Sequence, residues 1–144
     1  MRFGKRKRRI SRLLIVEDEP LIAFDTEYFL GESGFEVIAT LDRVADAVRI
    51  ITRDMATIDL VLADVNLADG SGIEVARTAS ALGVPVMFVT GNCPGEARTL
   101  AIGCLAKPYQ QRDLLAAIEA IDAVLAGEAP RRVPAGFNLF AANV

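Results

Sequence analysis

The sequence predicts an α/β fold in which five βα units form a doubly wound parallel sheet. From Leu13 onward, short apolar runs alternate about five times with segments patterned as helices, which is typical of parallel βαβ units. The chain has 144 residues, of which 52% are hydrophobic, so one domain with a sizeable core accounts for its length. Right-handed crossovers and a single switch point leave few arrangements. We expect the flavodoxin-like (βα)5 fold with strand order 2-1-3-4-5.

The first half of the chain contains three predicted strands and two helices. Pro20 occupies the tolerated first position of the first helix, and Gly34 lies just past its end. Asp42 is expected to cap the second helix. The predicted elements are, in order, a strand over 13–16, a helix over about 20–32, a strand over about 35–40, a helix that continues to about Arg53, and a strand over Leu60–Ala63 that ends at Asp64.

The second half contains three predicted helices and two strands. The turn 69–72 precedes the third helix, which Gly83 closes, and the final helix carries an apolar stripe with Asp113, Glu119 and Asp122 off it. The predicted elements are a helix over about 73–82, a strand over 84–89 that ends at Thr90, a weak helix over roughly 95–102, a strand over 104–106 and a helix over 110–125.

Charge divides the chain into a basic arm and an acidic body. Seven of the sixteen Lys and Arg residues lie within residues 1–12, which contain no acid, although the net charge of the chain is −3. We expect residues 1–12 to be a flexible basic arm, 13–127 the folded domain and 128–144 a C-terminal tail, because periodicity is lost after Gly127.

Composition excludes several classes of site. The absence of histidine excludes Ser-His-Asp and Cys-His catalysis, histidine-ligated zinc and phosphohistidine on this chain. Apolar runs end after about six residues, short of the ~20 of a membrane helix, and the acids from Glu17 onward interrupt any signal peptide. We expect a cytoplasmic protein without membrane insertion. In that setting Cys93 and Cys104 are expected to be small hydrophobes without a structural disulfide.

Charged residues follow three of the predicted strands. Glu17 and Asp18 follow the first, Asp64 follows the third, and Lys107 follows the fifth. The carboxyl ends of parallel strands meet where open α/β sheets bind ligands, so three carboxylates and an ammonium converge. Carboxylates this close repel one another unless a cation lies among them. Mg²⁺ suits a site with few protein oxygens, and it indicates phosphoryl chemistry.

These residues also lie in motifs that resemble the receiver domain of bacterial two-component response regulators. The resemblance covers about Leu13 to Leu125. The matching motifs are Leu-Ile-Val-Glu17-Asp18-Glu-Pro, Leu-Val-Leu-Ala-Asp64-Val-Asn66-Leu, Phe88-Val-Thr90-Gly91 and Lys107-Pro108-Tyr109. One such motif is weak evidence, whereas four in order at the ends of four strands are highly specific.

The resemblance implies a role for each matching residue. Asp64 would be the phosphoacceptor, and Thr90 and Lys107 would contact phosphoryl oxygens. Asp64, Asp18 and the backbone carbonyl of Asn66 would ligate Mg²⁺, with Glu17 contributing through water. The donor would be a phosphohistidine on a sensor histidine kinase. Separately, Gly91, Pro94 and Gly95 weaken local helix formation, so we expect phosphorylation to order or shift residues 91–103 and to create a contact face with the fifth strand and the last helix.

The sequence departs from the family pattern at three places. Cys104 occupies a position that is commonly aromatic and used as a rotameric switch, and Leu67-Ala68 replaces the usual Met-Pro. The stretch from Phe88 resembles a subgroup of alphaproteobacterial stand-alone receivers, but Asn92-Cys93 stands where an aromatic residue is expected. Threonine–aromatic switching therefore does not carry over intact.

The resulting prediction is a single-domain response regulator, a signalling phosphoacceptor rather than an enzyme, which promotes its own phosphorylation and dephosphorylation. The roughly seventeen residues after Gly127 leave no room for an effector domain, so output is expected through an unknown protein target or as a phosphate sink, from a monomer or weak dimer. One alternative is a small Mg²⁺-dependent aspartyl phosphohydrolase, although Asn66 stands where such enzymes place an acid. The other is a nucleic-acid binder that uses the arm, which has one aromatic residue and no recognisable binding fold.

Overall fold

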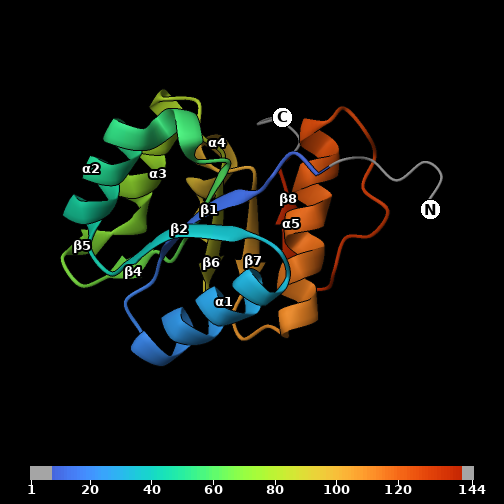
Figure 1. Cartoon of the computed structure of the whole chain (residues 1–144), viewed down its shortest axis with the longest axis horizontal. Helices are drawn as coiled ribbons and strands as arrows, with labels where there is room; N and C mark the ends of the chain where they lie inside the picture. The colour runs from blue at the N-terminus through green and yellow to red at the C-terminus, as the bar shows by residue number, and fades with distance from the viewer. Residues whose placement is uncertain (1–7, 141–144) are drawn as a thin grey trace.

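The computed structural model describes residues 8–140 and contains a six-stranded sheet (Figure 1). Its order is β2-β1-β3-β6-β7-β8, with parallel pairing from β2 to β7, which confirms the predicted order of five parallel strands. The strands are β1 (Arg12–Val16), β2 (Glu36–Leu41), β3 (Leu60–Ala63), β6 (Val86–Thr90), β7 (Gly103–Ala106) and β8 (Phe137–Leu139), with β4 (Asn66–Leu67) and β5 (Gly70–Ser71) forming a separate two-stranded hairpin.

Helices cover both faces of the sheet and divide the core into two apolar clusters. One cluster lies under α2 and α3 and includes Phe88 and Cys104. The other lies under α1 and α5 and includes Leu30 and Ile118 (Figure 1). The helices are α1 (Pro20–Glu32), α2 (Val44–Asp54), the 3₁₀ turn η1 (Met55–Thr57), α3 (Gly72–Ala81), α4 (Ala97–Leu100) and α5 (Gln111–Leu125). No helix within residues 8–140 is long and apolar enough to cross a membrane.

The N-terminus of α2 is capped from a distant loop, which corrects the prediction for Asp42. The side chain of Asp69 accepts hydrogen bonds from the backbone N–H groups of Val44 at 2.5 Å and Ala45 at 3.1 Å. Asp42 instead uses its backbone carbonyl to accept from Ala68. These contacts satisfy donors that a helix leaves open in its first turn and fix the hairpin after β3 against α2.

Two aspartates hold the chain where it enters the sheet. Asp122 on α5 accepts hydrogen bonds from the N–H groups of Arg9 at 2.9 Å and Ile10 at 2.7 Å. Asp59 accepts from Ser11 and from Arg12, where β1 begins. Residues 9–12, predicted as the end of a flexible arm, are thus attached to the domain. The first part of the predicted arm, residues 1–7, lies outside the described residues.

The segment after Gly127 was predicted as a tail, but part of it extends the sheet. β8 pairs antiparallel with β7, so that Leu105 lies opposite Phe137 and Gly103 opposite Leu139. A side chain at Gly103 would meet the Phe137 ring at 2.6 Å, so glycine is required for this close approach. The two prolines of the segment precede the strand, which is why they do not prevent pairing. The expected contact face is changed as well, because β8 covers the edge of β7.

Cys93 and Cys104 form a disulfide, which corrects the prediction of two separate apolar cysteines. Cys104 is 2% exposed, as expected of a core residue, whereas Cys93 lies exposed after β6. Their Cα atoms are 6.4 Å apart. The segment between β6 and β7 has only one short helix, α4, and it folds back onto the sheet. Sequence spacing alone did not show that this path brings the two residues together.

A close contact at Gly72 leads to the first testable prediction. A methyl group at Gly72 would overlap the backbone oxygen of Asp64, so Gly72→Ala must displace backbone at the end of β3. We expect urea denaturation to show a loss of roughly 2–3 kcal/mol in the free energy of unfolding. Gly31→Ala is the control, because that site on α1 has nothing within 4 Å and alanine is favoured over glycine in helices by up to ~1 kcal/mol. Equal stability of the two variants would contradict this packing.

Candidate functional site

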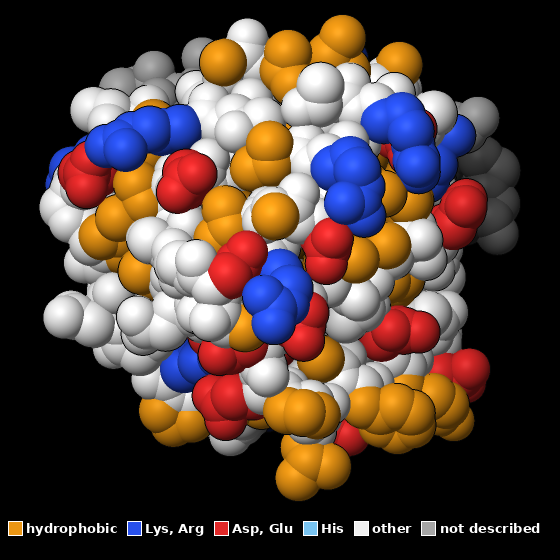
Figure 2. Space-filling model, turned by 90° about the vertical axis from the view of Figure 1, so that its left-hand side faces the viewer, with side chains coloured by type: hydrophobic (Ala, Val, Ile, Leu, Met, Phe, Trp, Pro, Cys, Tyr) orange, Lys and Arg blue, Asp and Glu red, His pale blue; other side chains and the backbone are white. Residues whose placement is uncertain are grey.

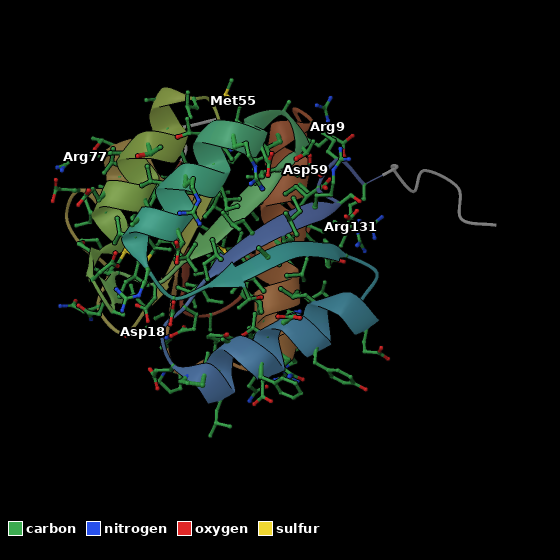
Figure 3. The ribbon with its side chains drawn as sticks, turned by 60° about the vertical axis from the view of Figure 1, so that its left-hand side comes forward. Arg9, Asp18, Met55, Asp59, Arg77 and Arg131 are labelled. Carbon is green, nitrogen blue, oxygen red and sulfur yellow. A yellow bond between two sulfur atoms is a disulfide. The ribbon has the colours of Figure 1, made fainter. Side chains whose placement is uncertain are left out.

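Backbone hydrogen bonds between neighbouring strands align the ends that carry the predicted site. The N–H of Asp64 donates to the carbonyl of Val16 at 2.9 Å, so the end of β3 lies beside the end of β1. The N–H of Lys107 donates to the carbonyl of Thr90 at 2.8 Å, which aligns β7 with β6 in the same way. Figure 3 shows Asp18 at the opposite end of the sheet from Arg9 and Asp59. The site therefore lies at the carboxyl edge of the sheet, as predicted.

Lys107 connects two of the predicted acids directly. Its Nζ donates to Glu17 Oε1 at 2.7 Å and to Asp64 Oδ2 at 2.8 Å. The side chains of Glu17 and Asp64 are 6% and 8% exposed, and that of Lys107 is 15% exposed, so both contacts are shielded from water. One ammonium thus compensates two buried carboxylates that would otherwise repel each other.

Burial and hydrogen bonding act in opposite directions on this pair. Burial raises the pKa of Glu17, because desolvation disfavours its charged form, and the hydrogen bonds from Lys107 and the Glu19 N–H offset only part of that effect. Burial also lowers the pKa of Lys107, but the hydrogen bonds to Asp64 and Glu17 together outweigh it, so its pKa is raised. Lys107 therefore stays positively charged at neutral pH.

The second oxygen of Asp64 is held by the backbone. Oδ1 accepts from the N–H of Val65 at 2.6 Å and, more weakly, from the N–H of Asn66 at 3.4 Å. The carboxylate is consequently fixed in orientation, with Oδ1 toward its own loop and Oδ2 toward Lys107. Such fixed positioning of a charged group is what phosphoryl transfer requires of a protein.

Glu17, Asp18 and Asp64 together form a group that can hold a metal ion. Each offers a carboxylate oxygen, and these atoms lie within 4.8 Å of one another. Asp18 is more exposed than the other two, and Asn66 is exposed beside them on β4. Hard oxygen ligands of this kind fit Mg²⁺, which keeps several of its waters and takes only a few carboxylates. The donor set therefore agrees with the predicted cofactor.

Thr90 is brought to the same edge but does not contact the acids. Its side chain is buried, at 3% exposure, and its hydroxyl faces the backbone of Asn92, with which it exchanges long contacts of 3.4 and 3.5 Å. The loop after β6 thus begins with a hydroxyl group that has no strong partner of its own. Thr90 is located beside the site through the Lys107–Thr90 backbone bond rather than through its side chain.

Sequence reasoning missed two contributors to the site and one pocket. The Val65 N–H carries no sequence signal, whereas Glu19 stands in the acidic run after β1 and reaches to 3.9 Å from Lys107. A pocket of about 490 Å³ opens between α1 and the start of α5 and shares Glu19 and Lys107 with the site. Its floor includes Thr26, whose hydroxyl lies 3.3 Å from that of Tyr109.

The raised pKa of Glu17 predicts how stability depends on pH. A group whose pKa is higher in the folded state contributes stability below its unfolded value, near 4.5, and loses it as pH rises through the folded value. Ionised Glu17 should therefore cost stability at pH 7, and Glu17→Gln should raise the urea midpoint in the presence of a chelator. The gain should shrink as the pH falls toward about 4.5 and should be absent below that value.

The matched control is Glu19→Gln, because Glu19 is exposed and only approaches Lys107. Its midpoint should stay close to that of the wild type at both pH values. A lower midpoint for Glu17→Gln at pH 7 would show that the bond to Lys107 outweighs the cost of burial.

Comparison with known proteins identifies the family. The response regulator receiver domain matches residues 13–119. The phyllosphere-induced regulator PhyR of Methylorubrum extorquens is 36% identical over 114 residues, which cover 75% of this chain and 42% of that protein. The cell cycle transcriptional regulator CtrA of Caulobacter vibrioides is 32% identical over 120 residues, which cover 76% of this chain and 49% of that protein. The chain spans about half the length of these curated relatives.

Solved structures show the same fold. A response regulator receiver protein from Sinorhizobium medicae has a TM-score of 0.65 and 26% identity, over 76% of this chain and 92% of that one. The response regulator PhyR from Brucella abortus has a TM-score of 0.59 and 32% identity, over 73% of this chain and 44% of that one. Since the family matches most of the chain and its solved members share the fold, the protein belongs to the response regulator receiver domain family.

Proposed function

We propose that this protein is a cytoplasmic response regulator that accepts a phosphoryl group on Asp64 from the phosphohistidine of a sensor histidine kinase. The observation that carries the proposal is the buried contact of Lys107 with both Asp64 and Glu17 at the carboxyl edge of the sheet. Output follows through contact with another protein, or the chain acts as a phosphate sink. Membership of the receiver family supports the signalling class, since receivers are phosphoacceptors rather than conventional enzymes.

The proposed reaction transfers phosphorus from nitrogen to oxygen. Oδ2 of Asp64 attacks the phosphorus atom, an O–P bond forms, and the N–P bond of the donor breaks, leaving its electron pair on the imidazole. The Val65 N–H keeps Oδ1 in place, so Oδ2, on the side of Lys107, is the oxygen that would attack the incoming phosphoryl group. In-line transfer of this kind depends on positioning and charge neutralisation more than on covalent help from the protein.

Glu17, Asp18 and Asp64 would hold Mg²⁺, together with the backbone carbonyl of Asn66. When bound, the ion would neutralise charge on the phosphoryl oxygens. The protein's part is to present these oxygens at one point, which the 4.8 Å spacing of the three carboxylates supports. Asn66 also argues against a phosphohydrolase, because an amide at that exposed position cannot serve a leaving group as a general acid.

Phosphorylation would rearrange the contacts around the acceptor. A phosphoryl group adds about −1.5 to −2 charges, so the Lys107 ammonium would shift from Oδ2 toward a phosphoryl oxygen. The Thr90 hydroxyl, with only long contacts to Asn92, is placed to turn toward the same group. That movement would displace residues 91–103, a segment that contains just the single helical turn α4. Segments with so little regular structure are where switching tends to occur.

The first prediction from this proposed function concerns the phosphoacceptor. Asp64→Asn should abolish incorporation of acid-labile phosphate from acetyl phosphate, because an amide oxygen is a poor nucleophile toward phosphorus. Intact-mass analysis measures the incorporation. Asp54→Asn is the control, since Asp54 is paired only with Arg53 at the surface. Undiminished labelling of the Asp64 variant would contradict the assignment.

A second prediction separates the two acids after β1. Asp18→Asn should weaken Mg²⁺ binding and slow phosphorylation together, because it removes a direct ligand. Glu17→Gln should have a smaller effect on Mg²⁺, since water would mediate that contact. A Mg²⁺ titration of phosphorylation rate compares them, and coincident curves would remove the distinction.

The surface of α1 next to the site supports contact with a partner protein. Leu21, Phe24 and Tyr28 are 79%, 66% and 64% exposed, although each is a large apolar side chain. They lie at helical spacing on α1, and Figure 2 shows apolar side chains gathered along the lower edge of the molecule, over this helix. Exposed apolar surface beside an acceptor site indicates a docking face. We propose that this face of α1 is the surface on which the sensor histidine kinase docks.

A third prediction tests this docking face. Phe24→Ala should slow phosphotransfer from a purified cognate kinase by about tenfold, as expected for loss of one aromatic interface anchor. Labelling by acetyl phosphate, which needs no docking, should be unchanged. Met55→Ala is the control, because Met55 is also exposed but lies away from α1 (Figure 3). Equal slowing in both variants, or none for Phe24→Ala, would contradict the assignment.

A further inference from the structure

The disulfide between Cys93 and Cys104 encloses most of the segment that separates two site residues. Cys93 lies three positions after Thr90, and Cys104 lies three positions before Lys107. The covalent ring therefore contains residues 94–103, including all of α4. The ring is therefore connected through short stretches of chain to Thr90 on one side and to Lys107 on the other, and both belong to the proposed phosphoryl site.

The two sulfur atoms differ in environment. Cys104 is 2% exposed on β7 and belongs to the apolar cluster that also contains Phe140 and Ala97. Cys93 is exposed in the loop after β6. The Cα separation of 6.4 Å lies within the range that a disulfide spans without moving the backbone. The bond thus joins an accessible sulfur to a sulfur held rigidly in the sheet.

We propose that Cys93 and Cys104 form a reversible thiol–disulfide site, oxidised by a low-molecular-weight or protein disulfide, which sets the freedom of residues 94–103. The part of this proposal that concerns the response to phosphorylation rests on the proposed function. Cytosolic disulfides, where they occur, are usually transient and redox-sensing, which fits a reversible bond in a receiver.

Oxidation proceeds by two exchange steps. The Cys93 thiolate attacks one sulfur of the oxidant disulfide, forming a mixed disulfide and releasing one thiolate. The Cys104 thiolate then attacks the Cys93 sulfur, forming the internal bond and releasing the second thiolate. The two cysteines lose two electrons and two protons, and the oxidant disulfide gains both to become two thiols. Reduction by a dithiol reverses the steps, beginning at the exposed sulfur of Cys93.

The start of the enclosed segment has few contacts of its own, whereas Ala97, Ala101 and Ile102 further along are buried in the core. A methyl group placed on Gly95 would meet nothing within 4 Å, and the ion pair of Glu96 with Arg77 is exposed. Closing a ring of this length removes many open conformations of the chain. Oxidation should therefore resist movement of α4, and also of Asn92, whose backbone contacts the Thr90 hydroxyl. The reduced protein should respond more fully to phosphorylation.

The thiol–disulfide site of Cys93 and Cys104 is tested on the unphosphorylated protein. The purified chain is equilibrated with oxidised or reduced glutathione and alkylated, and its intact mass is measured by mass spectrometry. Amide hydrogen exchange is measured on both forms. We expect the oxidised form to escape alkylation and to exchange amides of 94–103 more slowly, by on the order of tenfold or more. Cys93→Ser, which changes an exposed residue, should exchange like the reduced protein under both conditions. Alkylation of both cysteines after oxidation, or equal exchange of the two forms, would overturn the proposal.

The link to phosphorylation is tested with acetyl phosphate and Mg²⁺. The change in exchange across 94–103 on phosphorylation should be smaller in the oxidised wild type than in the reduced wild type, and should not depend on redox state in Cys93→Ser. Equal responses in phosphorylated oxidised and reduced wild type would overturn the coupling. Failure of both forms to take up phosphate would overturn the proposed function, while the alkylation and exchange results still decide the disulfide site.

Discussion

The buried ammonium of Lys107 is the interaction on which the arrangement of the site depends. Glu17 and Asp64 directly follow the neighbouring strands β1 and β3 and have almost no exposure to water. Their negative charges are tolerated because Lys107 contacts both, at 2.7 and 2.8 Å. Removing Lys107 would leave two buried carboxylates without a compensating charge, which is far more costly than the loss of a surface pair. The same contact links β7 to β1 and β3 and orients Asp64 Oδ2, so the stability of this edge and its proposed chemistry have a common origin.

The parts of the fold that arise from local pattern were predictable. Apolar runs ending in charged residues located the strand ends, Pro20 marked the start of α1, and the topological rules for parallel sheets gave the order that brings Glu17, Asp64 and Lys107 together. Contacts between distant segments left no comparable signal. Asp69 caps α2 across an intervening strand, and Asp122 binds backbone more than a hundred positions away. The orientation of Asp64 by the Val65 N–H was equally hidden, because a backbone donor is present at nearly every residue.

β8 changes the expected surface of the switch. Receiver signalling through the edge of β7 would require that edge to be open, but here the N–H of Ala106 donates to Gly136 and β8 pairs with residues 103–105. β7, which Lys107 follows, is therefore bonded on both sides. Phe140 packs beneath α4, where Arg98 lies over its ring. Movement of α4 or β7 on phosphorylation would displace the C-terminal segment that is packed against them. Under the proposed function, the outward surface of α4 and β8, rather than the edge of β7, would be the face that reports phosphorylation of Asp64.

The most direct measurement of this account is nuclear magnetic resonance of the lysine ammonium groups. The chain has three lysines, and Lys107 is the single one beyond the N-terminal arm, so Lys107→Met assigns its signal. Shielding by Glu17 and Asp64 predicts a slowly exchanging Lys107 ammonium at neutral pH in the unphosphorylated protein. When acetyl phosphate and Mg²⁺ phosphorylate Asp64, the signal should persist and shift as the ammonium moves to the phosphoryl group. Absence of a protected signal beforehand, or an unchanged signal in protein shown by mass to be phosphorylated, would contradict the central role of Lys107.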